Sequence, residues 1–177
     1  RIPISVPDLS GREAEYLQEC ISTGWVSSIG PFVERFEAEF AKFCQQPYGV
    51  SLNSGTAAIH LALRVVEVEP CDEVIVPAVT FASVANSVLY QGATPVFVDC
   101  KSDNWNIDPE CVEAAITSKT KAIMPVHLYG LPCDIKPIVE IGQRNNLPVI
   151  EDCAEAHGAE RDSQIVGSFG TIGCFSF

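Results

Sequence analysis

Short apolar runs alternate with helical patterns along most of this chain. The runs have the length and composition of strands, and five of them lie at 48–53, 73–77, 95–99, 121–127 and 147–152. Each of the first four precedes a segment with apolar residues at helical spacing, and the fifth leads into a glycine-rich segment. Strand followed by helix at this spacing is typical of a mainly parallel sheet with helices on both faces. We therefore predict one α/β domain in three layers, α/β/α.

Two further helical patterns precede these units, at 10–21 and 31–43. The first opens on Ser10 and Glu13, whose spacing predicts a capping box. The second has Pro31 in its first turn, where proline fits a helix well. It also carries four phenylalanines at helical spacing, which we expect to face the core: Phe32, Phe36, Phe40 and Phe43.

The charge and hydropathy of the chain argue against two classes of partner. The 23 acidic and 11 basic residues give a net charge of −12, and such a molecule repels the phosphate backbone of a nucleic acid. None of the apolar runs approaches the roughly 20 residues of a membrane-spanning helix, and the polar opening has no signal-peptide core. We therefore expect that neither nucleic acid nor a membrane is a partner and that the protein is cytoplasmic. Any anionic ligand must then be held by a local site.

Ligands of parallel α/β sheets bind at the carboxyl ends of the strands. At the first such end, NSGTAA (53–58), the chain turns through Gly55 directly into a helix. The free N–H groups and positive end of that helix would suit a phosphate, although an ordinary capped turn is the alternative. The motif is neither a dinucleotide-binding G-x-G-x-x-G nor a Walker A loop.

Three further strand ends carry candidate ligand residues. Phe81 follows the second run and is either a core residue or a platform for a flat ring. Glu151 and Asp152 end the fifth run, where alternation lets only one of them point to a given face. A buried carboxylate needs a partner, which a protonated pyridine nitrogen would supply; magnesium is the competing ligand. With Ser176 at the last strand end, these groups suit pyridoxal 5′-phosphate (PLP).

Six segments, in the family's order, resemble the DegT/DnrJ/EryC1/StrS sugar aminotransferases, which have the fold of aspartate aminotransferase. They are SLNSGTAAIHLAL, DEVIVPAVTFASVANSVLYQGATPVFVD, NIDPE, TKAIMPVHLYG, LPVIEDCAEAHGA and VGSFGTIGCFSF, and the resemblance runs from about Ile2 to Phe177. It implies a PLP enzyme that transfers an amino group, with glutamate as the expected donor, to a keto carbon of a nucleotide-linked deoxysugar. TGWVSSIGPFVERFE and EDCAEAHGA look most like the branch that makes 4-amino-4,6-dideoxy sugars such as GDP-perosamine.

The resemblance also implies roles for individual residues. Gly55 and Thr56 would hold the cofactor phosphate, and Ser176 would add a second hydroxyl. Phe81 would stack on the pyridine ring. Asp152 would pair with the ring nitrogen and keep it protonated, so that the ring withdraws electrons from the carbanion formed in transamination.

Two more residues receive roles in the same way. Glu155 would reach the ring hydroxyl of the cofactor, at a position where family members often have Gln. Trp25 lies in a Gly/Ser-rich loop that the resemblance makes a wall of the active site, so we expect it to contact substrate or to fix the loop. The family further implies a homodimer with shared active sites.

The resemblance places the Schiff-base lysine just after Phe177, followed by more strands and a small C-terminal domain. We therefore expect residues 1–177 to be the N-terminal part of the PLP-binding large domain, without that lysine and without the small domain. The five lysines of the chain lie in helical patterns, at the wrong end of a strand or in an acidic loop. A dehydratase relative, with histidine in place of the lysine, and a non-catalytic truncated product are the alternative hypotheses.

Overall fold

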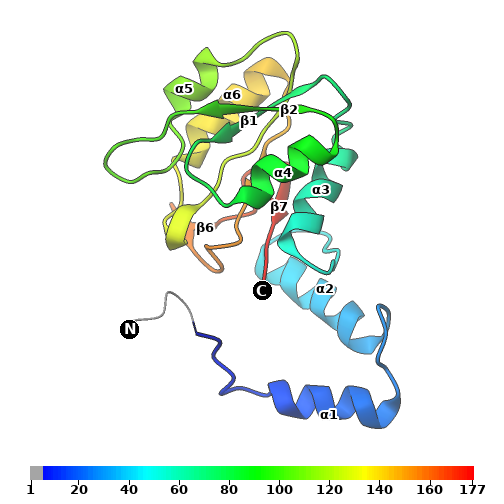
Figure 1. Cartoon of the computed structure of the whole chain (residues 1–177). Coiled ribbons are helices and arrows are strands. Elements are labelled where there is room, and N and C mark those ends of the chain that lie inside the picture. The colour runs from blue at the N-terminus through cyan, green and yellow to red at the C-terminus, as the bar shows by residue number, and fades with distance from the viewer. Residues whose placement is uncertain (1–5) are drawn as a thin grey trace.

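A computed structural model describes residues 6–177, which form a parallel sheet between two layers of helices (Figure 1). The strands, in spatial order, are β2 (Thr94–Val98), β1 (Glu73–Pro77), β3 (Thr120–Ile123), β4 (Ile150–Asp152) and β7 (Ile172–Cys174). Parallel ladders join β2 to β1, β1 to β3 and β4 to β7. Parallel bridges from Ile123 to Val149 and from Val126 to Asp152 connect the two parts. The predicted parallel sheet is thereby confirmed.

Helices cover both faces of this sheet. On one face lie α3 (Gly55–Val65) and α4 (Ala82–Tyr90), and on the other α5 (Pro109–Ala114) and α6 (Ile135–Asn145). Alternate residues of β1 serve the two layers: Val74 and Val76 pack with the α3 and α4 cluster, whereas Ile75 packs with the α5 and α6 cluster. Period-two alternation in fully buried strands is what the apolar runs predicted, and the three-layer α/β/α architecture is confirmed.

The strand predicted at 48–53 is wrong. This segment forms no ladder with another strand among residues 6–177. Ser51 instead donates its backbone N–H and its hydroxyl to Glu37 Oε1, at 2.8 and 2.9 Å. Its apolar composition suits a strand, but a strand also needs a partner for its backbone groups. After β4 the chain makes a short antiparallel hairpin, β5 (Glu160–Arg161) with β6 (Gln164–Ile165), which the sequence did not predict.

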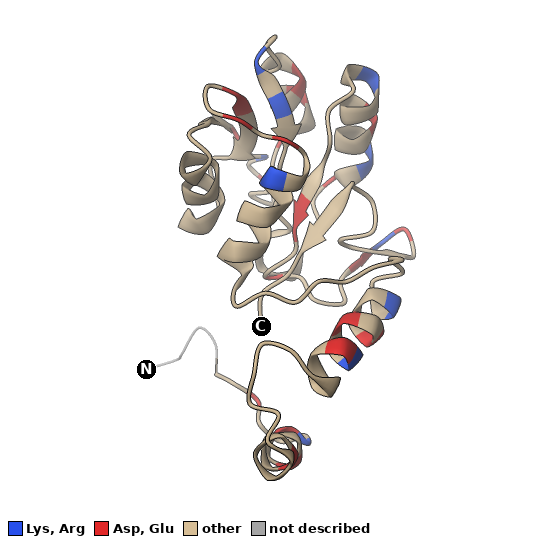
Figure 2. Cartoon of the chain, turned by 90° about the vertical axis from the view of Figure 1, so that its right-hand side faces the viewer, with Lys and Arg blue, Asp and Glu red and all other residues tan. Residues whose placement is uncertain are grey.

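The first two helices, α1 (Glu13–Thr23) and α2 (Pro31–Phe43), extend away from the sheet (Figures 1 and 2). Pro31 occupies the first turn of α2, as predicted. The prediction of a capping box is wrong, because α1 begins after Arg12 without a side-chain cap. Ser10 instead donates its N–H to Asp8 Oδ1, at 3.0 Å.

The phenylalanines of α2 do not reach the core of the sheet. Phe36 and Phe43 are exposed, because α2 leaves the sheet instead of crossing it. The ring of Phe40 packs edge-on against Phe175, with 4.9 Å between centroids, and that of Phe36 packs against Phe177, at 5.3 Å. Phe36 and Phe40 thus form an aromatic cluster with Phe175 and Phe177 instead of a face that packs on the core.

Charged side chains lie mostly on the helices and loops around the sheet (Figure 2). Within residues 6–177, no helix combines the length and the apolar character needed to cross a membrane.

Candidate active site

The first turn of α3 and the Ser176 hydroxyl, together called the cradle, offer hydrogen-bond donors that could hold an anion. Ser54 caps the helix by accepting the Ala57 N–H at 3.2 Å, while the N–H groups of Gly55 and Thr56 have no partner in the described part of the chain. A Cβ placed on Gly55 would lie 2.8 Å from Ser176 Cβ and 3.2 Å from Ser176 Oγ. Two free N–H groups, the helix dipole and a hydroxyl therefore converge, as a phosphate requires.

Asp152 lies at the carboxyl end of β4 and is 3% exposed. Its Oδ1 accepts the Ala154 N–H at 3.0 Å. Burial raises the pKa of this carboxyl, and the charge of Glu155 adds to the rise; the bond from Ala154 and the nearby His127 lower it in part. A buried acid of this kind gains most as an anion when a cation lies beside it. The protonated nitrogen of a pyridine ring fits that need.

Phe81 and Glu155 lie at the same edge of the sheet. Phe81 precedes α4 and is 70% exposed, so it is not a core residue and its ring is free to cover a flat ligand. Glu155 is exposed, and its Oε2 accepts the Tyr129 N–H at 2.8 Å. One oxygen of that carboxylate is therefore already bound, and its contact with a cofactor hydroxyl stays a prediction.

Trp25 lies apart from these residues. Its ring packs over Gly30, where an added Cβ would come within 2.9 Å of it, in the loop that joins α1 to α2. That loop lies away from the sheet in both views of the chain (Figures 1 and 2). The structure therefore brings together Gly55, Thr56 and Ser176, and places Phe81, Asp152 and Glu155 at the same edge, but does not bring Trp25 to them.

Comparison with known proteins identifies the family. The profile of the DegT/DnrJ/EryC1/StrS aminotransferases matches residues 7–177. The chain belongs to this family. The predicted membership, made from six short segments, is confirmed.

Similar proteins support a narrower comparison within the family. A GDP-perosamine synthase of Caulobacter vibrioides is 50% identical over 177 residues, which are 100% of this chain and 48% of that protein. A UDP-N-acetyl-3-dehydro-alpha-D-glucosamine 3-aminotransferase of Acidithiobacillus ferrooxidans is 55% identical over 141 residues, 80% of this chain and 38% of that protein. The chain spans about half the length of the curated relatives that it matches across its whole length.

A solved family structure has the same fold. The PLP form of a sugar aminotransferase from Streptococcus pneumoniae superposes with a TM-score of 0.94 at 36% identity, covering 99% of this chain and 48% of that one. The residues of the cradle and the acid at the end of β4 fit such a cofactor, because one end of the site offers donors to a phosphate and the other an anion to a ring nitrogen.

Each of the five lysines of the chain lies outside the candidate site. Lys42 and Lys136 lie in α2 and α6, and Lys121 lies in β3. Lys101 pairs with Asp134 at 3.6 Å. The fifth, Lys119, immediately precedes β3.

Sequence reasoning missed the role of Glu151. This side chain points away from the site, is fully buried and accepts hydrogen bonds from the turn at 167–170 and from His127. His127, which follows β3, is also fully buried. The useful signal was the Glu-Asp pair itself, because the carboxylate that does not face the ligand needs donors of its own.

A metal at this cluster is not supported. Ligand atoms of His127, Glu151 and Cys153 lie within 4.8 Å of one another. Each of these side chains is already hydrogen-bonded, with Cys153 Sγ 3.8 Å from the Glu151 carbonyl oxygen. We therefore assign no metal site to it.

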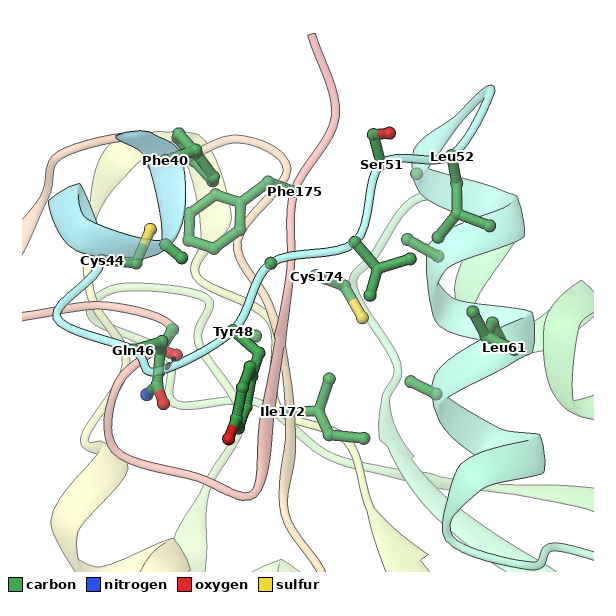
Figure 3. Close-up of a pocket in the computed structure, with 18 of the residues that line it drawn as sticks. Phe40, Cys44, Gln46, Tyr48, Ser51, Leu52, Leu61, Ile172, Cys174 and Phe175 are labelled. Carbon is green, nitrogen blue, oxygen red and sulfur yellow. Dashed lines mark hydrogen bonds between the residues drawn. The ribbon is translucent and has the colours of Figure 1, made fainter. Parts of the chain in front are cut away.

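A groove of about 590 Å³ lies between the segment at 46–55 and β7 (Figure 3). Its walls are mainly apolar, with Leu52 and Leu61 on one side of β7 and Phe40 and Phe175 on the other. Of the predicted cofactor residues only Gly55 and Ser176 line it. The groove therefore meets the cradle at one end and does not contain the rest of the site.

Proposed function

We propose that the whole protein is a PLP-dependent aminotransferase of the cytoplasm that moves an amino group, with glutamate as donor, to a nucleotide-linked keto sugar. The observation that carries this proposal is the contact between the first turn of α3 and Ser176, at the same sheet edge as the buried Asp152. Phosphate donors and a ring-nitrogen acid are the two contacts that a pyridoxal phosphate site needs most. Membership of an aminotransferase family supports the reaction type.

The residues of the chain would share the work as follows. The N–H groups of Gly55 and Thr56 and the Ser176 hydroxyl bind the phosphate. Phe81 covers one face of the ring, and Asp152 holds a proton on the ring nitrogen. When bound, the cofactor supplies an electron sink for the carbanion of transamination.

We propose GDP-linked 4-keto-6-deoxy sugars as the substrate class. Identity of 50% along the whole chain to a GDP-perosamine synthase supports this choice. The relative that acts on a UDP-linked 3-keto sugar matches over a shorter segment. Trp25 would contact the sugar or the nucleotide of this substrate only if the α1–α2 loop packed against an active site.

Reduction with borohydride tests the cofactor. We expect the purified whole protein to be yellow with PLP, to lose that colour on reduction, and to carry the cofactor on a lysine shortly after Ser176 in peptide maps. Phosphate-free pyridoxal serves as the control ligand and should label weakly. Cofactor attached to Lys101, Lys119 or any other lysine of residues 1–177 would contradict both the proposed site and the role of Ser176.

We also propose a homodimer with shared active sites. Its support in the structure is α1, which has no buried residue although Leu17 and Ile21 form an apolar face. Exposed apolar surface of this kind is typical of a contact with another protein chain. Sedimentation of the active whole protein should give twice the monomer mass, and activity that persists in a sample of monomers alone would contradict the proposal.

A further inference from the structure

Glu151 is a buried charge that makes none of the cofactor contacts proposed above. Phe169 and Gly170 donate their backbone N–H groups to its Oε1, at 2.8 and 2.7 Å. Gly167 donates its N–H to Oε2 at 2.9 Å, and His127 Nε2 lies 3.0 Å from the same oxygen. Because four donors and no acceptor surround it, this side chain is held as a carboxylate.

The hydrogen bonds of His127 fix its tautomer. Its Nδ1 accepts the Cys133 N–H at 3.1 Å, so the ring proton lies on Nε2 and is donated to Glu151. The negative charge of Glu151 is stabilised chiefly by the backbone N–H groups of the turn at 167–170, and the turn is in return tied to β4.

The same turn packs directly against β7. A Cβ on Gly173 would lie 2.6 Å from Gly167 Cα, and a Cβ on Gly167 would lie 2.6 Å from the Cζ atom of Phe175. Two residues after Cys174, the last residue of β7, Ser176 meets Gly55. The position of the Ser176 hydroxyl therefore depends on β7, which pairs with β4 along one side and packs against the turn.

We infer that Glu151 is a positioning residue for the phosphate cradle, because its carboxylate holds the 167–170 turn against β7 and so keeps Ser176 beside Gly55. The inference rests on the proposed function and adds to it a residue that does not touch the cofactor. β4 also has backbone hydrogen bonds that do not involve Glu151. The Asp152 backbone N–H donates to the Pro125 carbonyl at 2.9 Å, and the Asp152 backbone carbonyl accepts the His127 backbone N–H at 3.0 Å. Contacts with the ring nitrogen should therefore survive the loss of the carboxylate.

The test compares the affinity of the cofactor-stripped whole protein for PLP and for pyridoxal, which lacks the phosphate. Glu151→Gln keeps the shape of the side chain but turns an amide NH₂ toward groups that are themselves donors. We expect the Kd for PLP to rise about 10-fold, the scale of one lost hydrogen bond to a charged group. The Kd for pyridoxal should change less than about 2-fold. Glu140→Gln, on the exposed side of α6, is the matched control and should change neither.

A cycle with Ser176→Ala tests whether Glu151 acts through the serine. The double variant should bind PLP no more weakly than the weaker single variant, because both changes remove the same contact. Independent, multiplying effects would overturn the inference. Should Glu151→Gln prove insoluble, Glu151→Asp keeps the charge and withdraws the oxygens, and the same PLP-specific loss is expected at a smaller size; equal loss for both ligands would overturn it.

Hydrogen exchange gives a reading without cofactor. In Glu151→Gln the amides of Gly167, Phe169 and Gly170 should exchange at least about 10-fold faster than in the parent protein. Unchanged exchange would overturn the inference whatever the affinities. A parent protein that binds PLP no more tightly than pyridoxal would instead overturn the proposed function, so the two failures are distinguishable.

Discussion

Replacing Asp152 with Asn is expected to lower the turnover number of the whole enzyme by about 10³-fold, the scale for loss of one preorganised charge contact at a reacting group. The amide keeps the bond from Ala154 but cannot hold a proton on the ring nitrogen. PLP should remain bound, since the phosphate donors are untouched. Asp103→Asn, at an exposed position in the loop after β2, is the matched control. Near-normal turnover of Asp152→Asn with cofactor bound would contradict the role of Asp152.

The same variant has a signature in stability that separates chemistry from folding. Burial raises the pKa of Asp152, so the folded state binds this proton more tightly than the unfolded state. The charged carboxylate therefore destabilises the cofactor-free protein at neutral pH, by about 1.4 kcal/mol for each unit of the rise. Without cofactor, Asp152→Asn should unfold at higher urea than the parent at pH 7. The difference should vanish as the pH falls below the ordinary value near 3.8.

The sequence predicted the sheet best where one strand is buried on both faces. Val74, Ile75 and Val76 are apolar in succession, and β1 lies between two strands and two helix layers. At 48–53 the composition is equally strand-like, yet no neighbouring strand pairs with it in the described residues. Local composition states what a segment can bury, but a ladder also depends on a second segment far along the chain.

In the candidate site, too, some features could be predicted from the sequence and others could not. Alternation predicted that only one of Glu151 and Asp152 faces the ligand, and the family resemblance assigned that role to Asp152. The surroundings of Glu151 could not be predicted, because three of its four donors are backbone N–H groups at 167–170. Backbone donors leave no mark in a side-chain pattern.

Gly55→Ala is expected to weaken PLP binding by roughly 10-fold, the cost of overfilling a well-packed contact. The new methyl group would lie 2.8 Å from Ser176 Cβ, an atom that cannot move without its backbone. Either the serine or the helix must shift, and the phosphate loses donors in both cases. Binding of pyridoxal without its phosphate should be unaffected, because Phe81 and Asp152 lie beyond the cradle.

The decisive control removes the atom that the methyl group meets. In a Ser176→Gly background, Gly55→Ala should cost nothing further, since the next contact of the added Cβ, with the Phe175 carbonyl oxygen at 3.5 Å, is an ordinary one. The affinity of the double variant for PLP should therefore equal that of Ser176→Gly. A full 10-fold loss from Gly55→Ala in that background would mean that the glycine acts on the phosphate by some route other than Ser176, and that the contact between α3 and the end of β7 does not form the cradle.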